Sequence, residues 1–487
     1  MRNPDTSRVR RLCIPLLSVT LVALALILPG SARAAEPPAT QFDVKRAPWP
    51  CFRGPYGNGS APVKGLELVD DLAEARLAWK SEVKLPPATL QERNEKLPRQ
   101  QQVWSGGYGS PIVAEGKVFL ACWRMPGRAD WTHDDNQKRE SRKKDIKADD
   151  LLYCFDAATG KLLWCSEQKE QGRPRPPYDS DAWMVLAWWN GCVFVPGTGE
   201  HLYAIDAAEG RLLWKGAIPR GGDEHKEGIG NPQTAGAAVS GGVLVCGEDR
   251  LTAWDCATGE DLWSGVTKWP YCMPVAWQHG GEPFFVVGGK LIEARTGKVR
   301  WEIPDPSEST TGDSVSGNYL VMSHRDVKSA TRAKHGITCF RISPDGFEEL
   351  WHEEWGYKPN VNRITATAVV GDLVVGKITD GTKTGVGCLD LATGARRGKR
   401  VNFWMSYAPL AAEGRLITER HTSLYYAEVD DGGLRPLNVK RNIWAISLCT
   451  HPAYANGFLY FRQTQADGHA RMVCYDLRAA RQEGRRQ

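Results

Sequence analysis

A repeated segment constrains the fold of this chain more than any other feature. The full pattern is an apolar run, an acidic residue, a turn of small residues ending in Gly, and a second apolar run ending in Trp, and some copies depart from it at the acidic residue or at the Trp. The clearest copies are LYCFDAATGKLLW (152–164), LYAIDAAEGRLLW (202–214) and LTAWDCATGEDLW (251–263). Eight copies align on the acidic position, at Asp156, Asp206, Asp255, Glu293, Ile342, Asp390, Glu428 and Asp476. Their spacing of 38 to 50 residues is typical of architectures in which each unit packs on its neighbours.

Each unit also has an earlier half, of which SPIVAEGKVFLA (110–121) is an example. Two alternating apolar runs joined by a short Gly-containing turn predict a β-hairpin. The later half predicts a second hairpin, because Asp can accept hydrogen bonds from the turn's own amides and Gly adopts positive φ at little cost. Four strands in each of eight units predict an all-β fold, an eight-bladed β-propeller with four-stranded blades.

The recurring Trp predicts how neighbouring blades pack. Five units carry it, and we expect its apolar face to cover the seam with the next blade while its indole N–H finds a partner there. Units six and seven have Gly398 and Pro436 instead, so their seams must pack differently. The last unit lacks a fourth strand, and LAWKSEV (77–83), with Trp79, supplies one. An N-terminal strand therefore closes the ring and removes its exposed edges. The five tryptophans are Trp164, Trp214, Trp263, Trp301 and Trp351.

The x-D-x-x-T-G-x-x-x-W repeat resembles the tryptophan-docking motif of quinoprotein alcohol dehydrogenase-like propellers, the PQQ-like repeats. The resemblance covers residues 77–477, and the implied architecture is similar to that of BamB. The segment WPCFRGPYGNGSAP (49–62) resembles the W-P-x-F-R-G-P-x-G-x-G stretch that precedes this propeller in many exported bacterial proteins. Because the repeated motif is a packing device, it implies a fold and no particular chemistry.

The start of the chain predicts export. A basic beginning, an apolar run from Leu12 to Leu28 and the small-residue site Ala32-Arg33-Ala34 are typical of a signal peptide. An uncleaved membrane anchor is the alternative, and the Sec and twin-arginine routes both stay open. We expect a signal peptide at 1–34, an N-terminal extension at 35–76, the propeller at 77–477 and a tail at 478–487. The mature chain would be extracytoplasmic, periplasmic or secreted, without stable membrane insertion once the signal is cleaved.

Charge and cysteine usage exclude several classes of protein. Residues 1–34 carry a net charge of +4 out of the chain's +5, so the folded part gives no electrostatic reason to expect nucleic acid. Twelve Cys remain after the signal, and no C-x-x-C occurs, which argues against zinc ribbons and thioredoxin-type chemistry. Cys154, Cys388 and Cys474 take a repeat position that elsewhere holds Ala, as expected of a buried small apolar site.

The resemblance also implies a test for a cofactor. Quinoprotein dehydrogenases hold pyrroloquinoline quinone on the propeller axis, commonly with a vicinal Cys-Cys disulfide, a Trp, a Ca²⁺ and a catalytic Asp. This sequence has no Cys-Cys dipeptide and no matching calcium-ligand segment, so no cofactor is expected. No catalytic residue and no metal site is assigned. The charged segment 124–150, with Lys143, Lys144, Asp149 and Asp150, reads as an exposed loop.

Residues just before the innermost strands are the candidates for a ligand site, because these strands converge on the axis. They could stack on and hydrogen-bond a flat or polar ligand, or simply pack the entrance. Aligning the first hairpins gives Tyr108, Trp183, Gln233, Tyr271, Thr310, Ile364, Ser406 and Cys449, with Arg363 and His451 beside them.

The sequence favours a non-catalytic, monomeric binding or scaffolding module for a protein or cell-envelope partner. Insertions at 86–104, 124–150, 167–181 and 220–231 would lengthen loops on a rigid ring, a usual place for recognition. A quinone-dependent oxidoreductase acting on an alcohol or sugar, with calcium, is the alternative. A polysaccharide or small-ligand binder is a third possibility.

Overall fold

The fold is known from a computed structural model. It describes residues 41–86, 107, 109–124, 147–173, 184–199, 201–218, 235–247, 250–266, 273–304, 313–324, 336–354, 366–380, 383–406, 408–420, 423–441, 450–465 and 469–480. All of these lie within one compact unit, Pro37–Gln487.

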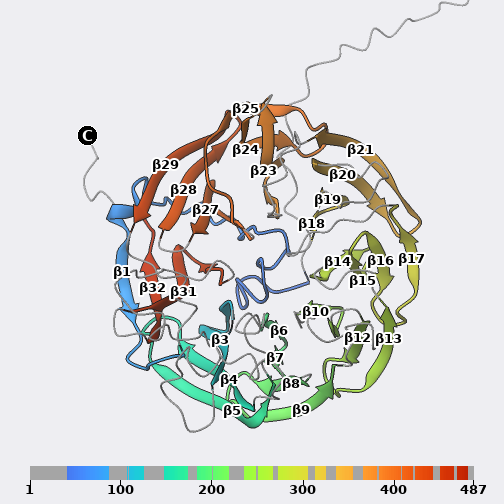
Figure 1. The fold of residues 1–487 in the computed structure, drawn as a ribbon, viewed down its shortest axis with the longest axis vertical. Helices are drawn as coiled ribbons and strands as arrows, with labels where there is room; N and C mark the ends of the chain where they lie inside the picture. Colours follow the sequence, from blue (N-terminus) through green and yellow to red (C-terminus); the bar gives the residue numbers. More distant parts are fainter. Residues whose placement is uncertain are drawn as a thin grey trace, which may run out of the picture. The chain divides into compact units, whose positions relative to one another are not determined.

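The described residues form eight four-stranded antiparallel sheets arranged in a ring, as predicted (Figure 1). Blade 1 is β2(Ile112–Ala114), β3(Lys117–Arg124), β4(Ala148–Asp156) and β5(Leu162–Gly172), and blade 2 is β6(Ala187–Trp189), β7(Cys192–Pro196), β8(His201–Asp206) and β9(Leu212–Ala217). Blade 3 is β10(Ala235–Ser240), β11(Val243–Gly247), β12(Arg250–Asp255) and β13(Asp261–Val266). Blade 4 is β14(Val275–His279), β15(Glu282–Val287), β16(Lys290–Glu293) and β17(Val299–Glu302). Blades 5 to 7 are β18(Ser314–Ser316), β19(Tyr319–His324), β20(Gly336–Ser343), β21(Gly346–Glu354); β22(Ala368–Val370), β23(Leu373–Asp380), β24(Lys383–Asp390), β25(Arg396–Val401); and β26(Leu410–Ala412), β27(Arg415–Arg420), β28(Ser423–Asp430), β29(Gly433–Arg441). Blade 8 is β30(Ala453–Ala455), β31(Phe458–Thr464), β32(Ala470–Asp476) and β1(Arg76–Lys80).

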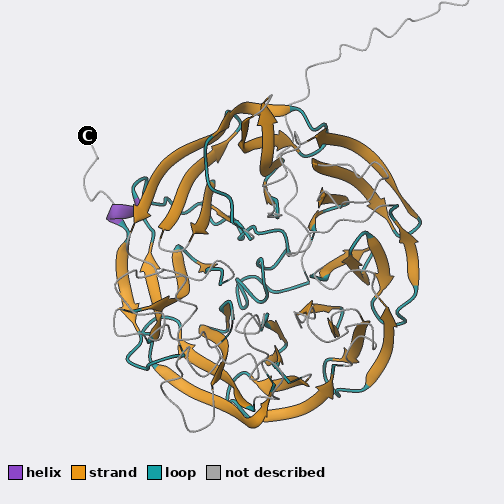
Figure 2. Ribbon diagram, viewed as in Figure 1, coloured by secondary structure: helices purple, strands orange, loops and turns teal. Residues whose placement is uncertain are grey.

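The first strand of each blade lies nearest the axis (Figure 2). Buried apolar side chains of neighbouring blades pack together between the sheets. In the described segments the one helix is the short η1(Leu72–Glu74), next to β1. No helix in the described ranges is long and apolar enough to span a membrane.

Ring closure joins the two ends of the chain. Strand β1 pairs antiparallel with β32, with Arg76 opposite Asp476 and Lys80 opposite Val473. The sequence prediction of an N-terminal closing strand is therefore confirmed.

The repeat turns have the predicted local structure. In blade 1, Asp156 Oδ1 accepts hydrogen bonds from the amides of Ala158 (3.1 Å) and Thr159 (2.8 Å). Gly160 follows at φ +73°, and Trp79 of the neighbouring blade packs against it. A Cβ at Gly160 would lie 2.3 Å from the Trp79 ring, so Gly is needed both for the turn and for the docking of Trp.

Six seams between described blades share one hydrogen bond. The indole N–H of the docking Trp donates to a carbonyl of the next blade's third-to-fourth-strand turn, which satisfies the polar end of a half-buried ring. The pairs are Trp79–Ala157 (3.0 Å), Trp164–Ala208 (3.0 Å), Trp214–Cys256 (3.2 Å), Trp263–Ala294 (2.7 Å), Trp301–Ser343 (2.8 Å) and Trp351–Leu391 (2.9 Å).

The two seams without a docking Trp are packed in other ways. At the seam of blades 6 and 7, Gly398 brings β25 so close to β29 that a Cβ would lie 2.1 Å from the carbonyl oxygen of Gly432. At the seam of blades 7 and 8, the segment before β1 fills the gap. Tyr426 donates to the carbonyl of Val69 (2.9 Å), and the amide of Val69 donates to Leu477 (2.8 Å).

The structure corrects the predicted loop at 124–150. Asp149 and Asp150 belong to β4 and are buried, at 5% and 2% exposed, because the strand begins at Ala148, three residues before the apolar run that starts at Leu151. Likewise, residues 167–172 of the proposed insertion 167–181 belong to β5. Lys143 and Lys144 lie outside the described residues.

The three repeat-position cysteines, Cys154, Cys388 and Cys474, are fully buried, as predicted. The ten cysteines in the described ranges are free thiols.

Candidate functional site

The N-terminal strap, residues 41–70, crosses the middle of the ring (blue in Figure 1). It adds short β-bridges to inner strands: Trp49 pairs with Val113, Cys51 with Ala187, and Ser60 with Ala411. Hydrogen bonds join the strap to seven of the eight described blades, and Val275 of blade 4 packs against it. These contacts include Trp49–Val113, Pro50–Trp188, Gln41–Val239, Asn58–Val315, Asn58–Val369, Ala61–Ala411 and Val69–Leu477.

Two glutamates, Glu413 and Glu115, bind the strap. Each lies in the turn between the first and second strands of its blade. Glu413 accepts hydrogen bonds from the amides of Lys64 (2.9 Å), Gly65 (3.0 Å) and Leu66 (3.2 Å). Glu115 forms an ion pair with Arg46. Both glutamates have positive φ, +49° and +52°, a conformation that is uncommon outside Gly, Asn and Asp. Both carboxylates therefore anchor the strap from turns of uncommon backbone conformation.

Arg53 is the strap's most buried charge, at 3% exposed. Its guanidinium donates to the carbonyls of Asp313 (3.0 Å) and Thr367 (2.5 Å) and to the Ser314 hydroxyl (2.7 Å). Burial lowers the pKa of Arg53 to about 10, and the nearby Asp313 carboxylate opposes that shift. The guanidinium is thus bound between the inner ends of blades 5 and 6.

His451 and Glu419, from blades 8 and 7, form a buried pair near the strap residue Phe52. The His451 Nδ1 and a Glu419 carboxylate oxygen are 2.5 Å apart, and the His451 amide donates to the Ser110 hydroxyl (3.0 Å). The ring of Phe52 lies 5.3 Å from that of His451. Burial raises the pKa of Glu419 above its ordinary value, while the charge of His451 and its hydrogen bond act in the opposite direction. A carboxylate in this position fixes the orientation of the imidazole.

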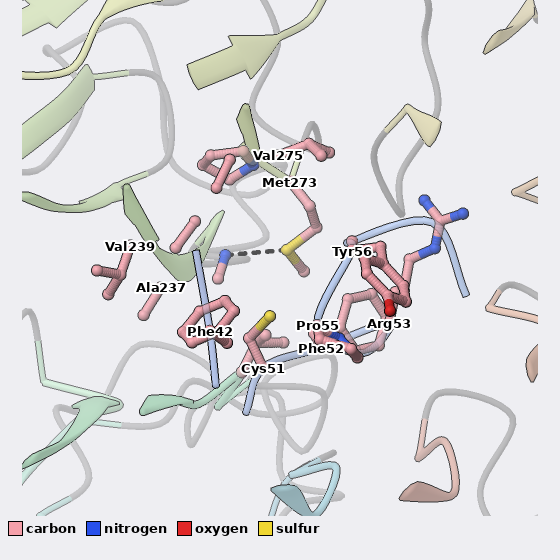
Figure 3. Close-up of a pocket in the computed structure, with 16 residues that line it drawn as sticks. Phe42, Cys51, Phe52, Arg53, Pro55, Tyr56, Ala237, Val239, Met273 and Val275 are labelled. Carbon is pink, nitrogen blue, oxygen red and sulfur yellow. Dashed lines mark hydrogen bonds between the residues drawn. The ribbon is translucent and has the colours of Figure 1, made fainter. Parts of the chain in front are cut away.

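A small pocket lies between the strap and blades 2 to 4 (Figure 3). Phe42, Cys51 and Phe52 form one wall, and Met273 and Val275 the other, while Arg53 points away. The centre of a water-sized molecule has about 40 Å³ in which to move. Since one water needs about 10–15 Å³ on this scale, the pocket has room for a few waters.

A second buried carboxylate lies off the axis, at the seam of blades 1 and 2. Asp150 accepts hydrogen bonds from Thr198 Oγ1 (2.7 Å), the Thr198 amide (3.2 Å) and the Tyr203 hydroxyl (3.2 Å). Burial raises the pKa of Asp150 to about 6, the Thr198 and Tyr203 hydrogen bonds act against that shift, and the charge of Asp149 adds to it. Its hydrogen-bond partners, Thr198 and Tyr203, belong to blade 2, so these contacts join the two blades.

Two of the predicted funnel residues can be placed. His451 and Ser406 are buried near the inner strands, and both lie beside Glu419, which joins them. Sequence alignment missed Glu419 because it lies late in a second strand. It also missed Arg53, whose only signal is its position in the Gly-rich segment 49–62. The other candidates, Tyr108, Trp183, Gln233, Tyr271, Thr310, Ile364, Cys449 and Arg363, lie outside the described residues.

The family follows from comparison with known proteins. A family model described as "Outer membrane protein assembly factor BamB" matches residues 148–400, more than half of the chain. The chain belongs to this family of PQQ-like propellers. No curated protein sequence matches it.

Solved PQQ-like propellers share the fold at low identity. Quinohemoprotein alcohol dehydrogenase from Comamonas testosteroni is 11% identical, with a TM-score of 0.53 over 90% of this chain and 82% of that one. A europium-containing methanol dehydrogenase is 10% identical, with a TM-score of 0.51 over 89% and 98%. BamB from Moraxella catarrhalis is 12% identical, with a TM-score of 0.47 over 80% and 99%. At these identities the dehydrogenase likenesses establish the fold alone.

The described residues do not fit an axial quinone. Phe52 and Arg53 lie across the level of the inner strands, where Arg53 already takes the acceptors of blades 5 and 6. The adjoining pocket, which Phe52 and Arg53 help to line, has room for a few waters. Within the described ranges, no group of three His, Cys, Asp or Glu side chains could hold a metal ion.

Proposed function

We propose that this PQQ-like propeller is a non-catalytic module, exported from the cytoplasm, that binds a protein or cell-envelope partner. The observation that carries the proposal is the N-terminal strap, which takes the axial position with Phe52 and Arg53. A strap that crosses the middle of the ring supports a use of the propeller's outer surfaces and loops rather than of a central cofactor site.

The seams support a scaffold role. Six docking tryptophans, each hydrogen-bonded across a seam of the described blades, make the ring rigid. Rigid scaffolds commonly carry recognition on their connecting loops. We assign the protein to the extracytoplasmic space as a monomer, with residues 1–34 removed on export.

Calorimetric titration with pyrroloquinoline quinone and Ca²⁺ tests the absence of a cofactor. We expect no heat of binding, and no dye reduction across a panel of alcohols and aldoses. Saturable quinone binding with turnover would instead establish the alternative, a quinone-dependent oxidoreductase.

Cross-linking in intact cells, followed by purification of the tagged full-length chain, tests the partner. A reproducible protein or envelope adduct that mapped to inter-blade loops would support the proposal. Recovery of the chain with its first 34 residues intact, or from the cytoplasm, would contradict the assigned export.

A further inference from the structure

Arg53 combines three features that are unusual in one residue. Its backbone is left-handed, with φ +63°, its side chain is buried, and its guanidinium binds groups from two other blades. Left-handed backbone is unfavourable for a long side chain, so surrounding contacts must hold it. The guanidinium contacts with Asp313, Ser314 and Thr367 are among those that hold it.

The acceptors around this guanidinium form a buried binding site whose groups also contact one another. Asp313, Ser314 and Thr367 are at most 4% exposed. Ser314 Oγ is 3.0 Å from the Thr367 carbonyl and 2.9 Å from the Thr367 hydroxyl, which fixes the two blades against each other. One terminal nitrogen of Arg53 donates to Asp313, and the other donates to both Ser314 and Thr367. This arrangement matches the planar fork of a guanidinium, which an ammonium group cannot reproduce.

The loop that carries Arg53 is closed on itself. The amide of Gly59 donates to the Arg53 carbonyl (3.0 Å), and the amide of Gly57 donates to that of Gly54 (3.1 Å). Arg53 therefore extends from a compact, hydrogen-bonded turn of the strap.

We propose that Asp313, Ser314 and Thr367 form an axial guanidinium-binding site, with Arg53 as its built-in ligand. The site selects a guanidinium over an ammonium cation, and it accepts an alkylguanidinium from solution once the Arg53 side chain is removed. Its occupation by Arg53 holds the strap across the axis.

Chemical rescue of Arg53→Gly tests the proposal. Glycine removes the side chain and also eases the left-handed backbone, so the loss measured is that of the guanidinium contacts. We expect the midpoint of thermal unfolding to fall by about 3–5 °C in a propeller of this size. Millimolar n-propylguanidinium should restore about half of that loss and leave the wild-type midpoint unchanged.

Matched controls separate the site from general effects of the additive. n-Propylammonium should not rescue Arg53→Gly. Arg46→Ala removes another strap arginine, whose side chain is 50% exposed, and should respond to neither compound. Absence of rescue by n-propylguanidinium, or equal rescue by n-propylammonium, would overturn the proposal.

A second variant covers the case in which Arg53→Gly does not fold. Ser314→Ala keeps Arg53 and removes one acceptor. Hydrogen exchange at the Gly57 and Gly59 amides should then accelerate at least several-fold, because the loop loses part of its anchor. Unchanged exchange at both amides would show that the site does not hold the strap, and would also overturn the proposal.

Discussion

Replacement of Asp150 by Asn should make the protein more stable at neutral pH, although it removes a hydrogen-bonded charge. Burial raises the pKa of Asp150 from an ordinary 3.8 to about 6. The folded state therefore holds the proton more tightly than the unfolded chain does. As pH rises from about 4 to about 6, this group lowers the free energy of unfolding, and above that window its effect is constant.

The size of the effect follows from the shift. A difference of about two pKa units corresponds to about 3 kcal/mol. Asn resembles the protonated carboxyl, since its oxygen can accept from Thr198 and its amide can donate to the Tyr203 hydroxyl. The variant should match the wild type near pH 4 and exceed its free energy of unfolding by up to about 3 kcal/mol at pH 7.

Urea unfolding of both proteins at intervals between pH 4 and 8 measures this difference directly. Asp345→Asn, at a side chain that is 91% exposed, is the matched control; because its ion pair with Arg300 is open to solvent, it should change the free energy of unfolding by less than about 1 kcal/mol. A constant difference between Asp150→Asn and wild type, or a variant less stable at pH 7 than at pH 4 relative to wild type, would refute the reasoning.

Three further predictions concern the seams and the strap. Trp79→Phe should lower the free energy of unfolding by about 1–2 kcal/mol, since the hydrogen bond to Ala157 and part of the packed ring are lost. Trp79→Ala should lower it by about 3–5 kcal/mol in urea titrations, and equal effects would contradict the assigned role of the ring face. Gly59→Ala should destabilise the protein by about 2–4 kcal/mol, because φ is +86° and the Cβ would lie 2.4 Å from the Pro409 carbonyl oxygen. Gly65→Ala, where the Cβ would meet open space, should cost only about 1 kcal/mol of stability. Similar losses in the two variants would argue against the close approach at Gly59. Glu413→Gln should reduce hydrogen-exchange protection at the amides of residues 64–66 by about 1 kcal/mol, and unaltered protection would remove Glu413 as an anchor.

The blades could be predicted because their determinants are local and repeated. Asp156 and Gly160 define a turn within five residues, and the same pattern recurs at regular spacing. Trp79 could be matched to a missing fourth strand because seven other units show where that strand belongs. The eight-bladed ring could therefore be predicted without knowledge of long-range contacts.

The axial site could not be predicted in the same way, because its contacts join residues far apart in the chain. Arg53 binds groups more than 250 residues later, and nothing in segment 49–62 repeats. The His451–Glu419 pair joins blades 7 and 8, and Glu419 lies late in β27, where no repeated position marks it. Asp149 and Asp150 were misread because adjacent acidic residues conceal the alternation of a strand.

The pairing of β1 with β32 has a consequence for biogenesis. The ring acquires its final seam only when residues near 476 are available to meet residues near 76, so completion cannot precede delivery of the C-terminal segment. Contacts of such long sequence separation make folding slow, and until β32 is available β1 and β31 each lack it as a partner. A truncated chain that ends before β32 should therefore expose unpaired edges and aggregate, while a permuted chain whose new ends fall in a single hairpin turn should close normally.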